Sequence, residues 1–444
     1  MARQVLPLAA LLLGMVFLML GGGLHGLLIP VRGQLEGFSS FSLGWIGTGY
    51  AVGFTFGCVA VPRLVRRAGH VRAFSALTAL MSISILGMGL AVHPIGWIVL
   101  RALSGFCFAG CYMVAESWLN EQVSNEMRGR LFSVYAITTM VAMAGGQYLL
   151  VLAEPTEDTL FMLGAVLFAL AVLPTAVSTA ASPAPLSQVK LDVGALFRNS
   201  PAAVVGSFLS GVISSAWTNF GPVFGTQVGF GSATLASLLA LALAGSVIFQ
   251  YPLGRLSDVI DRRYVMVVAG VLGAAAGMLM VWLANQGEFG AVFFAAVVLY
   301  GGVIYSIYSL AVAHGNDYAE ADQFVQVSSG LLIMYGFGTM AGPLFTAQLM
   351  DMVGPSGVFT ATTLAHGALA VYAGYRTFKR PALAHEERND YQILALARTQ
   401  TPESYVLDPR SYLDDAGEEV ELPPMLPPVE VEAPEPAGPD VPRP

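Results

Sequence analysis

Apolar residues fall into twelve runs along this chain, and each run is about as long as a membrane crossing requires. A helix that crosses a lipid bilayer needs about 20 predominantly apolar residues, and short polar loops separate runs of this length almost to residue 380. The pattern therefore predicts an all-α polytopic membrane protein with twelve transmembrane helices in two pseudo-symmetric six-helix bundles. The expected spans are residues 5–31, 42–62, 71–92, 95–118, 131–153, 159–180, 201–225, 232–251, 264–284, 289–313, 324–350 and 357–376.

The longest loop between spans lies at residues 181–200 and divides the helices into two sets of six. We therefore expect an N-terminal six-helix bundle at 1–180, a cytoplasmic linker at 181–200 and a C-terminal six-helix bundle at 201–380. The remaining segment, 381–444, is acidic and rich in Pro and Glu, a composition typical of disordered chain. A solvated tail is the expectation there, and docking of a partner is the alternative.

Composition and charge support a membrane protein and exclude a soluble enzyme. Hydrophobic residues make up 55% of the chain and charged residues only 11%, whereas soluble proteins carry about 25% charged residues. Lys and Arg collect in every second loop, and such loops are cytoplasmic. We therefore expect a multi-pass protein of the cell (inner) membrane with both termini in the cytoplasm.

The two halves are related by an ungapped offset of 192 residues, as in transporters that arose by duplication. At this offset Pro30 corresponds to Pro222, Gly110 to Gly302 and Gly146 to Gly338. Matching residues recur across several spans, which indicates two copies of one six-helix unit.

The same offset aligns basic loop residues of one half with acidic loop residues of the other. In a pseudo-two-fold arrangement each basic loop would face an acidic loop. We expect ionic contacts that close the cytoplasmic side when the protein opens outward, although loop charges could also serve only to set the topology. Glu116, at the inner end of the fourth span, is expected at this cytoplasmic gate, with a coupling carboxylate as the alternative. The expected pairs are Arg66 and Arg67 with Glu320 and Asp322, and Asp258 with Arg128 and Arg130.

Several motifs resemble those of one transporter family. The segment Gly254–Arg263 resembles G-x-L-x-D-R-x-G-R-R, the loop signature of the major facilitator superfamily, and Pro62–His70 keeps its frame in the first half. Arg101–Gly105 is similar to the R-x-x-x-G motif of that superfamily, and Gly338–Pro343 resembles a G-x-x-x-G-P bend. Within the superfamily, Ala115–Asn120 is similar to the YcaD-like branch, whose substrate is not settled.

The resemblance implies transport by alternating access, with helices 1, 4, 7 and 10 lining a central cavity. Drug/proton antiporters of the superfamily carry the G-x-x-x-G-P bend in helix 5. Here residues 142–147 of the fifth span contain no such proline, which weighs against multidrug efflux.

Arg101 and His25 are the main candidates for the substrate or coupling site. An ionisable side chain inside a membrane is costly and commonly functional. Arg101 would bind an anionic substrate or tune a proton site, unless it extends to the outer interface. His25 lies in the glycine-rich run Gly21–Gly26 and could carry a proton, with a packed or interfacial histidine as the alternative.

Further polar and aromatic residues in the spans are weaker candidates. Trp217 and Asn219 could stack on and hydrogen-bond to a substrate, with interfacial anchoring as the alternative for Trp217. At least one of Tyr305 and Tyr308 is expected to face the cavity. Gln147 and Gln250 complete the candidates.

These observations predict a secondary active transporter of a small organic solute by alternating access, coupled to protons. A drug or amphiphile efflux antiporter and a non-transporting membrane sensor on the same fold are the alternatives. The sequence contains no P-loop, nucleophile elbow, zinc-ligand spacing or dinucleotide fingerprint. We therefore expect no enzyme activity, cofactor or metal site. The expected partners are a small-molecule substrate, the lipid bilayer and protons, with no nucleic acid, and the expected state is a monomer.

Overall fold

The computed structural model describes residues 2–121, 125–176, 193–319, 323–381, 391 and 399–406, with side chains described at 9–120, 133–174, 194–319, 323–381, 391 and 399–405. Within these residues, regular structure is helical throughout, and twelve helices have 18 or more residues. The predicted all-α fold with twelve long helices is thereby confirmed. The long helices are α1 (Ala2–Leu35), α2 (Ser40–Ala68), α3 (His70–Leu90), α4 (Pro94–Glu121), α5 (Asn125–Tyr148), α6 (Thr159–Ala176), α8 (Pro201–Gln227), α9 (Ser232–Val259), α10 (Arg262–Gln286), α11 (Ala291–Asn316), α12 (Phe324–Val353) and α13 (Gly357–Thr377).

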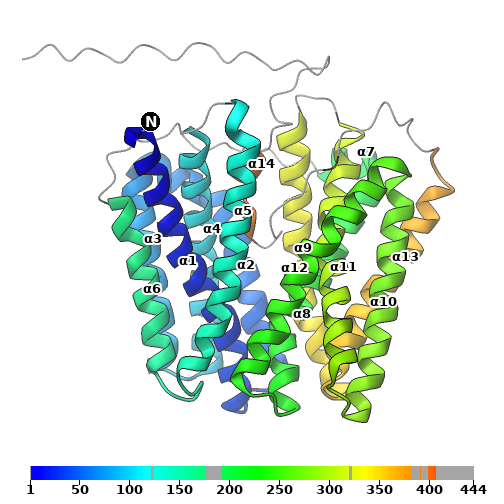
Figure 1. Cartoon of the computed structure of the whole chain (residues 1–444), viewed down its shortest axis with the longest axis horizontal. Helices are drawn as coiled ribbons and strands as arrows, with labels where there is room; N and C mark the ends of the chain where they lie inside the picture. The colour runs from blue at the N-terminus through cyan, green and yellow to red at the C-terminus, as the bar shows by residue number, and fades with distance from the viewer. Residues whose placement is uncertain are drawn as a thin grey trace, which may run out of the picture.

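Three short helices complete the described chain. A single 3-10 turn, η1 (Leu149–Leu152), follows α5. The short helix α7 (Val193–Asn199) precedes the second half, and α14 (Pro402–Val406) lies in the C-terminal segment. Figure 1 shows α7 and α14 at the same end of the bundle as the start of α1. We call this the α7 end, and the opposite end of the bundle the far end.

The ends of the helices follow from capping residues in the sequence. Ser39 and Ser200 precede α2 and α8, and each side-chain oxygen accepts a hydrogen bond from a backbone N–H in the first turn. Pro201 occupies the first turn of α8, where its missing N–H costs nothing. Gly287 ends α10 in the left-handed conformation with φ of 71°.

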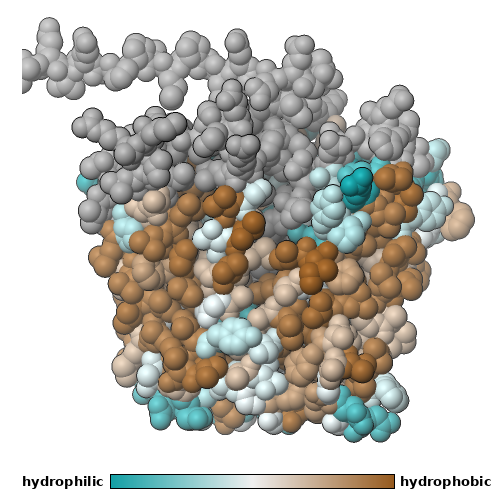
Figure 2. Space-filling model, in the orientation of Figure 1, coloured by the Kyte–Doolittle hydropathy of each residue, from teal (hydrophilic) through white to brown (hydrophobic). Residues whose placement is uncertain are grey.

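The outer surface of the bundle is apolar over the middle of its height. In the part of the chain that the structure describes, ten helices have both the length and the hydropathy of a membrane span. The described apolar stretch of α6 is shorter, Thr159–Pro174, and α13 buries the polar Thr362 and His366. Large apolar side chains such as Ile95 and Val371 remain exposed, and Figure 2 shows a brown belt with hydrophilic residues gathered at the ends. This surface fits contact with lipid rather than water.

The helices form two halves, α1–α6 and α8–α13, which stand side by side in Figure 1. Equivalent pairs of helices cross in both halves through direct backbone contact. A Cβ atom at Gly53 would lie 1.8 Å from the carbonyl oxygen of Ala102, and one at Gly105 would lie 2.1 Å from that of Tyr50. Glycine therefore allows α2 and α4 to approach closely. The crossing of α9 and α11 uses Gly245 and Gly301 in the same way, and Gly245 lies 192 residues after Gly53, as the repeat predicts.

The two halves contact each other toward the far end. There α2 packs against α12, α1 against α8 and α5 against α9. At the α7 end, α14 instead packs against α4 of the first half and α12 of the second. Hydrogen bonds that join the halves at the far end include Gln227 Nε2 to Gln34 Oε1 at 3.1 Å, Thr48 Oγ1 to the carbonyl of Met340 at 2.8 Å, and the hydroxyls of Tyr148 and Ser237 at 3.1 Å.

The α2–α4 crossing predicts a specific effect of an added methyl group. We expect Gly105→Ala to lower the free energy of unfolding by about 1–3 kcal/mol, because the methyl group would press on the backbone of Tyr50. Gly96→Ala in the same helix is the matched control, because nothing lies within 4 Å of its Cβ position and alanine favours the helix. Melting temperatures in detergent test this. Equal melting temperatures for the two variants would contradict the close contact.

Candidate functional site

A cavity lies between the two halves, and its two walls differ in chemistry. The wall from the first half carries aromatic side chains and one cation, whereas the wall from the second half carries hydroxyl and amide groups. This arrangement suits a ligand with one charged end and an apolar body. The lining residues include His25, Tyr50, Phe54, Arg101, Phe108 and Tyr112 from the first half, and Ser214, Ser215, Thr218, Asn219, Tyr335 and Thr339 from the second.

Arg101 is buried at the cavity, with 6% of its surface exposed. Its Nη1 atom lies 2.9 Å from His25 Nδ1, and its guanidinium carbon lies 4.5 Å from the centre of the Tyr50 ring. Among the lining residues described, Arg101 is the sole formally charged side chain. The side chain therefore lies against His25 and Tyr50 in the cavity wall rather than extending to the outer interface.

The contact between Arg101 and His25 determines the tautomer of the histidine. Arginine has only donor groups and remains protonated, so His25 Nδ1 must accept the hydrogen bond. Neutral His25 then carries its proton on Nε2, and this atom is buried with no hydrogen-bond partner among the described residues. The imidazole is 1% exposed and packs near the rings of Phe108 and Phe168.

The wall from the second half is built by α8 and α12. Ser214 and Tyr335 share a hydrogen bond of 2.7 Å between their hydroxyls, and Asn219 Nδ2 donates to the carbonyl of Ser215 at 2.9 Å. Of these residues, only Asn219 is a candidate from the sequence. The polar run of serines and Thr218 along α8 was a visible signal, because such residues are uncommon on a lipid-facing helix. Tyr50 gave no signal, because it is one of many aromatic residues in the spans.

Four predicted residues are buried away from the cavity lining. Trp217 has no exposed surface, and its ring lies 5.4 Å from that of Tyr300, edge to face, within the second half. Gln250 Nε2 donates to the carbonyl of Tyr305 at 3.3 Å. Gln147 is 3% exposed in α5. The structure thus places Trp217, Tyr305, Gln147 and Gln250 between packed helices. The sequence shows that these residues are polar or aromatic, but it does not show which face of each helix meets the cavity.

Glu116 and Tyr308 contact a C-terminal segment whose composition predicts a solvated tail. Glu116 is 1% exposed and accepts hydrogen bonds from Ser404 Oγ at 2.7 Å, from Tyr135 OH at 3.2 Å and from Thr401 Oγ1. Tyr308 shares a hydrogen bond with Tyr405 and, like Tyr305, is absent from the cavity lining, so neither of the two predicted tyrosines faces the cavity. The sequence predicts a solvated tail over 381–444, whereas the structure buries residues 399–405. The composition of the tail describes residues 381–444 on average. It does not reveal that seven of them fit between α4 and α12.

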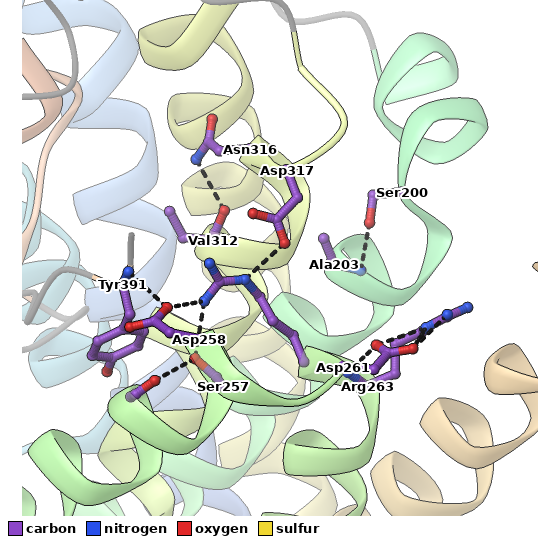
Figure 3. Close-up of polar contacts among 12 residues, drawn as sticks. Ser200, Ala203, Ser257, Asp258, Asp261, Arg263, Val312, Asn316, Asp317 and Tyr391 are labelled. Carbon is purple, nitrogen blue, oxygen red and sulfur yellow. Dashed lines mark hydrogen bonds and ion pairs between the residues drawn. The ribbon is translucent and has the colours of Figure 1, made fainter. Parts of the chain in front are cut away.

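The loop signature forms a cluster of charges at the start of α10 (Figure 3). Arg262 donates to Asp317 at 2.7 Å and to Asp258 at 3.2 Å, and Asp258 also accepts from the backbone N–H of Tyr391 at 2.9 Å. Asp261 caps α10 through the N–H of Arg263. Burial opposes ionisation of Asp261, but the hydrogen bonds from Arg263 outweigh it and lower the pKa of Asp261 below its ordinary value.

The expected loop-to-loop gate is only partly within the described residues. Arg66 and Arg67 are exposed at the end of α2, and Asp258 pairs with Arg262 of its own half. The other expected partners lie outside the described side chains, so the ionic gate stays a prediction. These partners are Arg128, Arg130, Glu320 and Asp322.

The buried pair of Arg262 and Asp317 predicts a large stability effect. Their side chains are 1% and 3% exposed, and removal of one partner from a buried pair costs about 3–5 kcal/mol. We expect Arg262→Met to lower the melting temperature in detergent strongly. Arg255→Met is the control, because Arg255 is exposed and surface changes stay within about 0.5 kcal/mol. A similar melting temperature for both variants would show that the pair contributes little.

Comparison with known proteins agrees with this fold. The chain matches the family model described as Major Facilitator Superfamily over residues 11–319 and 229–397. The protein from Escherichia fergusonii named "Uncharacterized MFS-type transporter YcaD" is 25% identical over 352 residues, covering 78% of this chain and 89% of its own. The crystal structure of the nucleoside transporter NupG aligns with a TM-score of 0.68 at 16% identity, covering 84% of this chain and 99% of that chain. A bacterial homolog of the human lysosomal transporter Spinster, inward-facing and occupied, aligns with a TM-score of 0.64 at 16% identity, over 86% of this chain and 98% of that chain. The chain therefore belongs to the major facilitator superfamily and is a multi-pass membrane protein.

Proposed function

We propose that this protein is a secondary transporter of a small organic anion, and that Arg101 binds the anionic group. The observation that supports this most strongly is the position of Arg101, the sole formally charged residue described in the cavity lining. A cation buried without an anionic partner is costly. Tyr50 and His25 reduce this cost only in part, since neither carries a negative charge. An anionic ligand at the guanidinium would supply the missing charge.

The remaining lining supports an organic rather than an inorganic anion. Phe54, Phe108 and Tyr112 offer apolar and aromatic surface on one wall, while Ser214 and Asn219 offer hydrogen-bonding groups on the other. A ligand with a carboxylate or similar group, a flat or apolar body and one or two polar substituents fits this division.

The contact between Arg101 and His25 provides a route to proton coupling. Protonation of His25 at Nδ1 would remove the acceptor for Arg101 and place two cations side by side. An anion bound to Arg101 offsets this repulsion, so binding of the anion and of the proton favour each other by linkage. Joint binding of an anion and a proton is the requirement for symport.

The contacts between the halves support an assignment of sidedness and state. Basic residues in the loops favour a cytoplasmic α7 end, with the far end facing out across the inner membrane. Because the halves pack together at the far end, the arrangement corresponds to a transporter closed to the outside. Alternating access then requires these far-end contacts to separate when the protein opens outward.

Arg101 gives the first test. We expect small organic anions, and not their neutral analogues, to raise the melting temperature of the purified protein, because a ligand that binds the folded state stabilises it. Arg101→Gln should weaken that binding by about 10- to 100-fold, the usual effect of losing a hydrogen bond to a charged group. Binding is measured by thermal shift across a ligand panel and then by titration.

Arg63→Gln is the matched control, because Arg63 is exposed at the end of α2 and should leave binding unchanged. Stabilisation by neutral ligands alone, or equal binding of anions by Arg101→Gln, would exclude the proposed anion site.

His25 gives the second test. In proteoliposomes, we expect a pH gradient to drive accumulation of the anion on the alkaline side. His25→Gln should keep binding and exchange of the anion but lose accumulation driven by the gradient, because glutamine carries no exchangeable charge. Gradient-driven accumulation by His25→Gln at the wild-type level would rule out His25 as the proton carrier.

A further inference from the structure

The segment Thr399–Tyr405 occupies the opening of the cavity at the α7 end. Thr399 and Pro402 are part of the cavity lining, together with Arg101 and the residues around it. Helix α14 packs against α4 on one side and α12 on the other. The segment therefore lies between the two halves at the α7 end, opposite the contacts that join the halves at the far end.

Hydrogen bonds hold the segment to the first half through Glu116. Two of the three hydroxyl groups that donate to this carboxylate come from the segment, Thr401 and Ser404, and the third is Tyr135. A buried carboxylate needs such donors to offset its lost hydration. Without the segment, Glu116 would keep only Tyr135 of these three donors.

Aromatic contacts hold the segment to the second half. Tyr405 is fully buried, and its hydroxyl group bonds to that of Tyr308 in α11 and to Gln400 within the segment. The Tyr405 side chain belongs to an apolar cluster that includes Tyr335 of α12. Tyr335 also lines the cavity. The same tyrosine therefore forms part of the cavity wall and part of the cluster that holds Tyr405.

A second contact positions the chain just before the segment. Tyr391 packs so closely on α9 that a Cβ atom at Gly254 would lie 2.2 Å from its ring, and its backbone N–H donates to Asp258 at 2.9 Å, as Figure 3 shows. This anchor, eight residues before Thr399, keeps the segment at a high local concentration near the opening.

We propose that Thr399–Tyr405 is an autoinhibitory plug, which closes the α7 end of the cavity and must leave before a ligand can pass there. The segment binds Glu116 through hydrogen bonds from two hydroxyl groups rather than through an ion pair. Such a contact is specific yet reversible. The plug does not depend on the identity of the transported solute, so it is tested separately from the proposed function.

A native cysteine allows a direct test. Cys58 lines the cavity, while Cys107 and Cys111 are buried and can be replaced by alanine. The rate at which a water-soluble maleimide modifies Cys58 in the purified protein, followed by intact mass, measures how often the cavity is open. The two proteins to compare are truncated after Arg398, which removes the segment, and after Val406, which retains it.

We expect the protein that ends at Arg398 to react at least about tenfold faster than the full chain, because accessibility scales with the population of the open state. The protein that ends at Val406 should react like the full chain. A synthetic peptide of residues 399–406 should slow the shorter protein in a saturable way. The same peptide with Thr401→Ala and Ser404→Ala should not.

Equal rates for both truncations and the full chain would overturn the plug, as would a protein ending at Val406 that reacts as fast as the shorter one. If the shorter truncation does not elute as a folded species in size-exclusion chromatography, the full chain with Thr401→Ala, Ser404→Ala and Tyr405→Phe replaces it. Faster modification of that variant supports the plug, and an unchanged rate refutes it.

Discussion

The close crossing of α2 and α4 is the constraint on which the candidate site depends. Gly53 and Gly105 bring the two backbones into contact, and this contact fixes the relative position of the residues one turn away. Tyr50 lies one turn before Gly53, and Arg101 one turn before Gly105. The crossing thus places the guanidinium over the Tyr50 ring, and the equivalent crossing of α9 and α11 builds the second half on the same plan.

The electrostatics of the cavity depend mainly on one buried cation, Arg101. Arg101 has no anionic partner among the lining residues described and is held by a hydrogen bond to His25 and by the face of Tyr50. Neither contact supplies a negative charge, which is the basis of the proposed preference for an anion. The hydrogen bond also makes the protonation of His25 sensitive to whether Arg101 is neutralised, which is the basis of the proposed coupling.

Access to this cavity differs between the two ends of the bundle. At the far end the halves are joined by direct contacts such as that of Thr48 with Met340. At the α7 end the space between α4 and α12 holds the segment Thr399–Tyr405. Glu116 belongs to α4, the helix that also carries Arg101, and it accepts hydrogen bonds from the C-terminal segment. The proposed plug is therefore attached to a helix that also builds the cavity wall.

The sequence by itself determined the number of helices, the division into halves and the family, because these depend on the length of apolar runs, a repeat offset and local motifs. It also identified Arg101, His25 and Asn219, since polar residues in an apolar span are visible without coordinates. Only the tertiary structure decided that Trp217, Tyr305, Gln147 and Gln250 lie outside the cavity lining, since rotation of a helix by packing decides which face meets the cavity. It alone revealed the seven residues of the tail at the cavity opening. Their docking depends on surfaces of α4, α11 and α12 that are far apart in the sequence, so no local pattern encodes it.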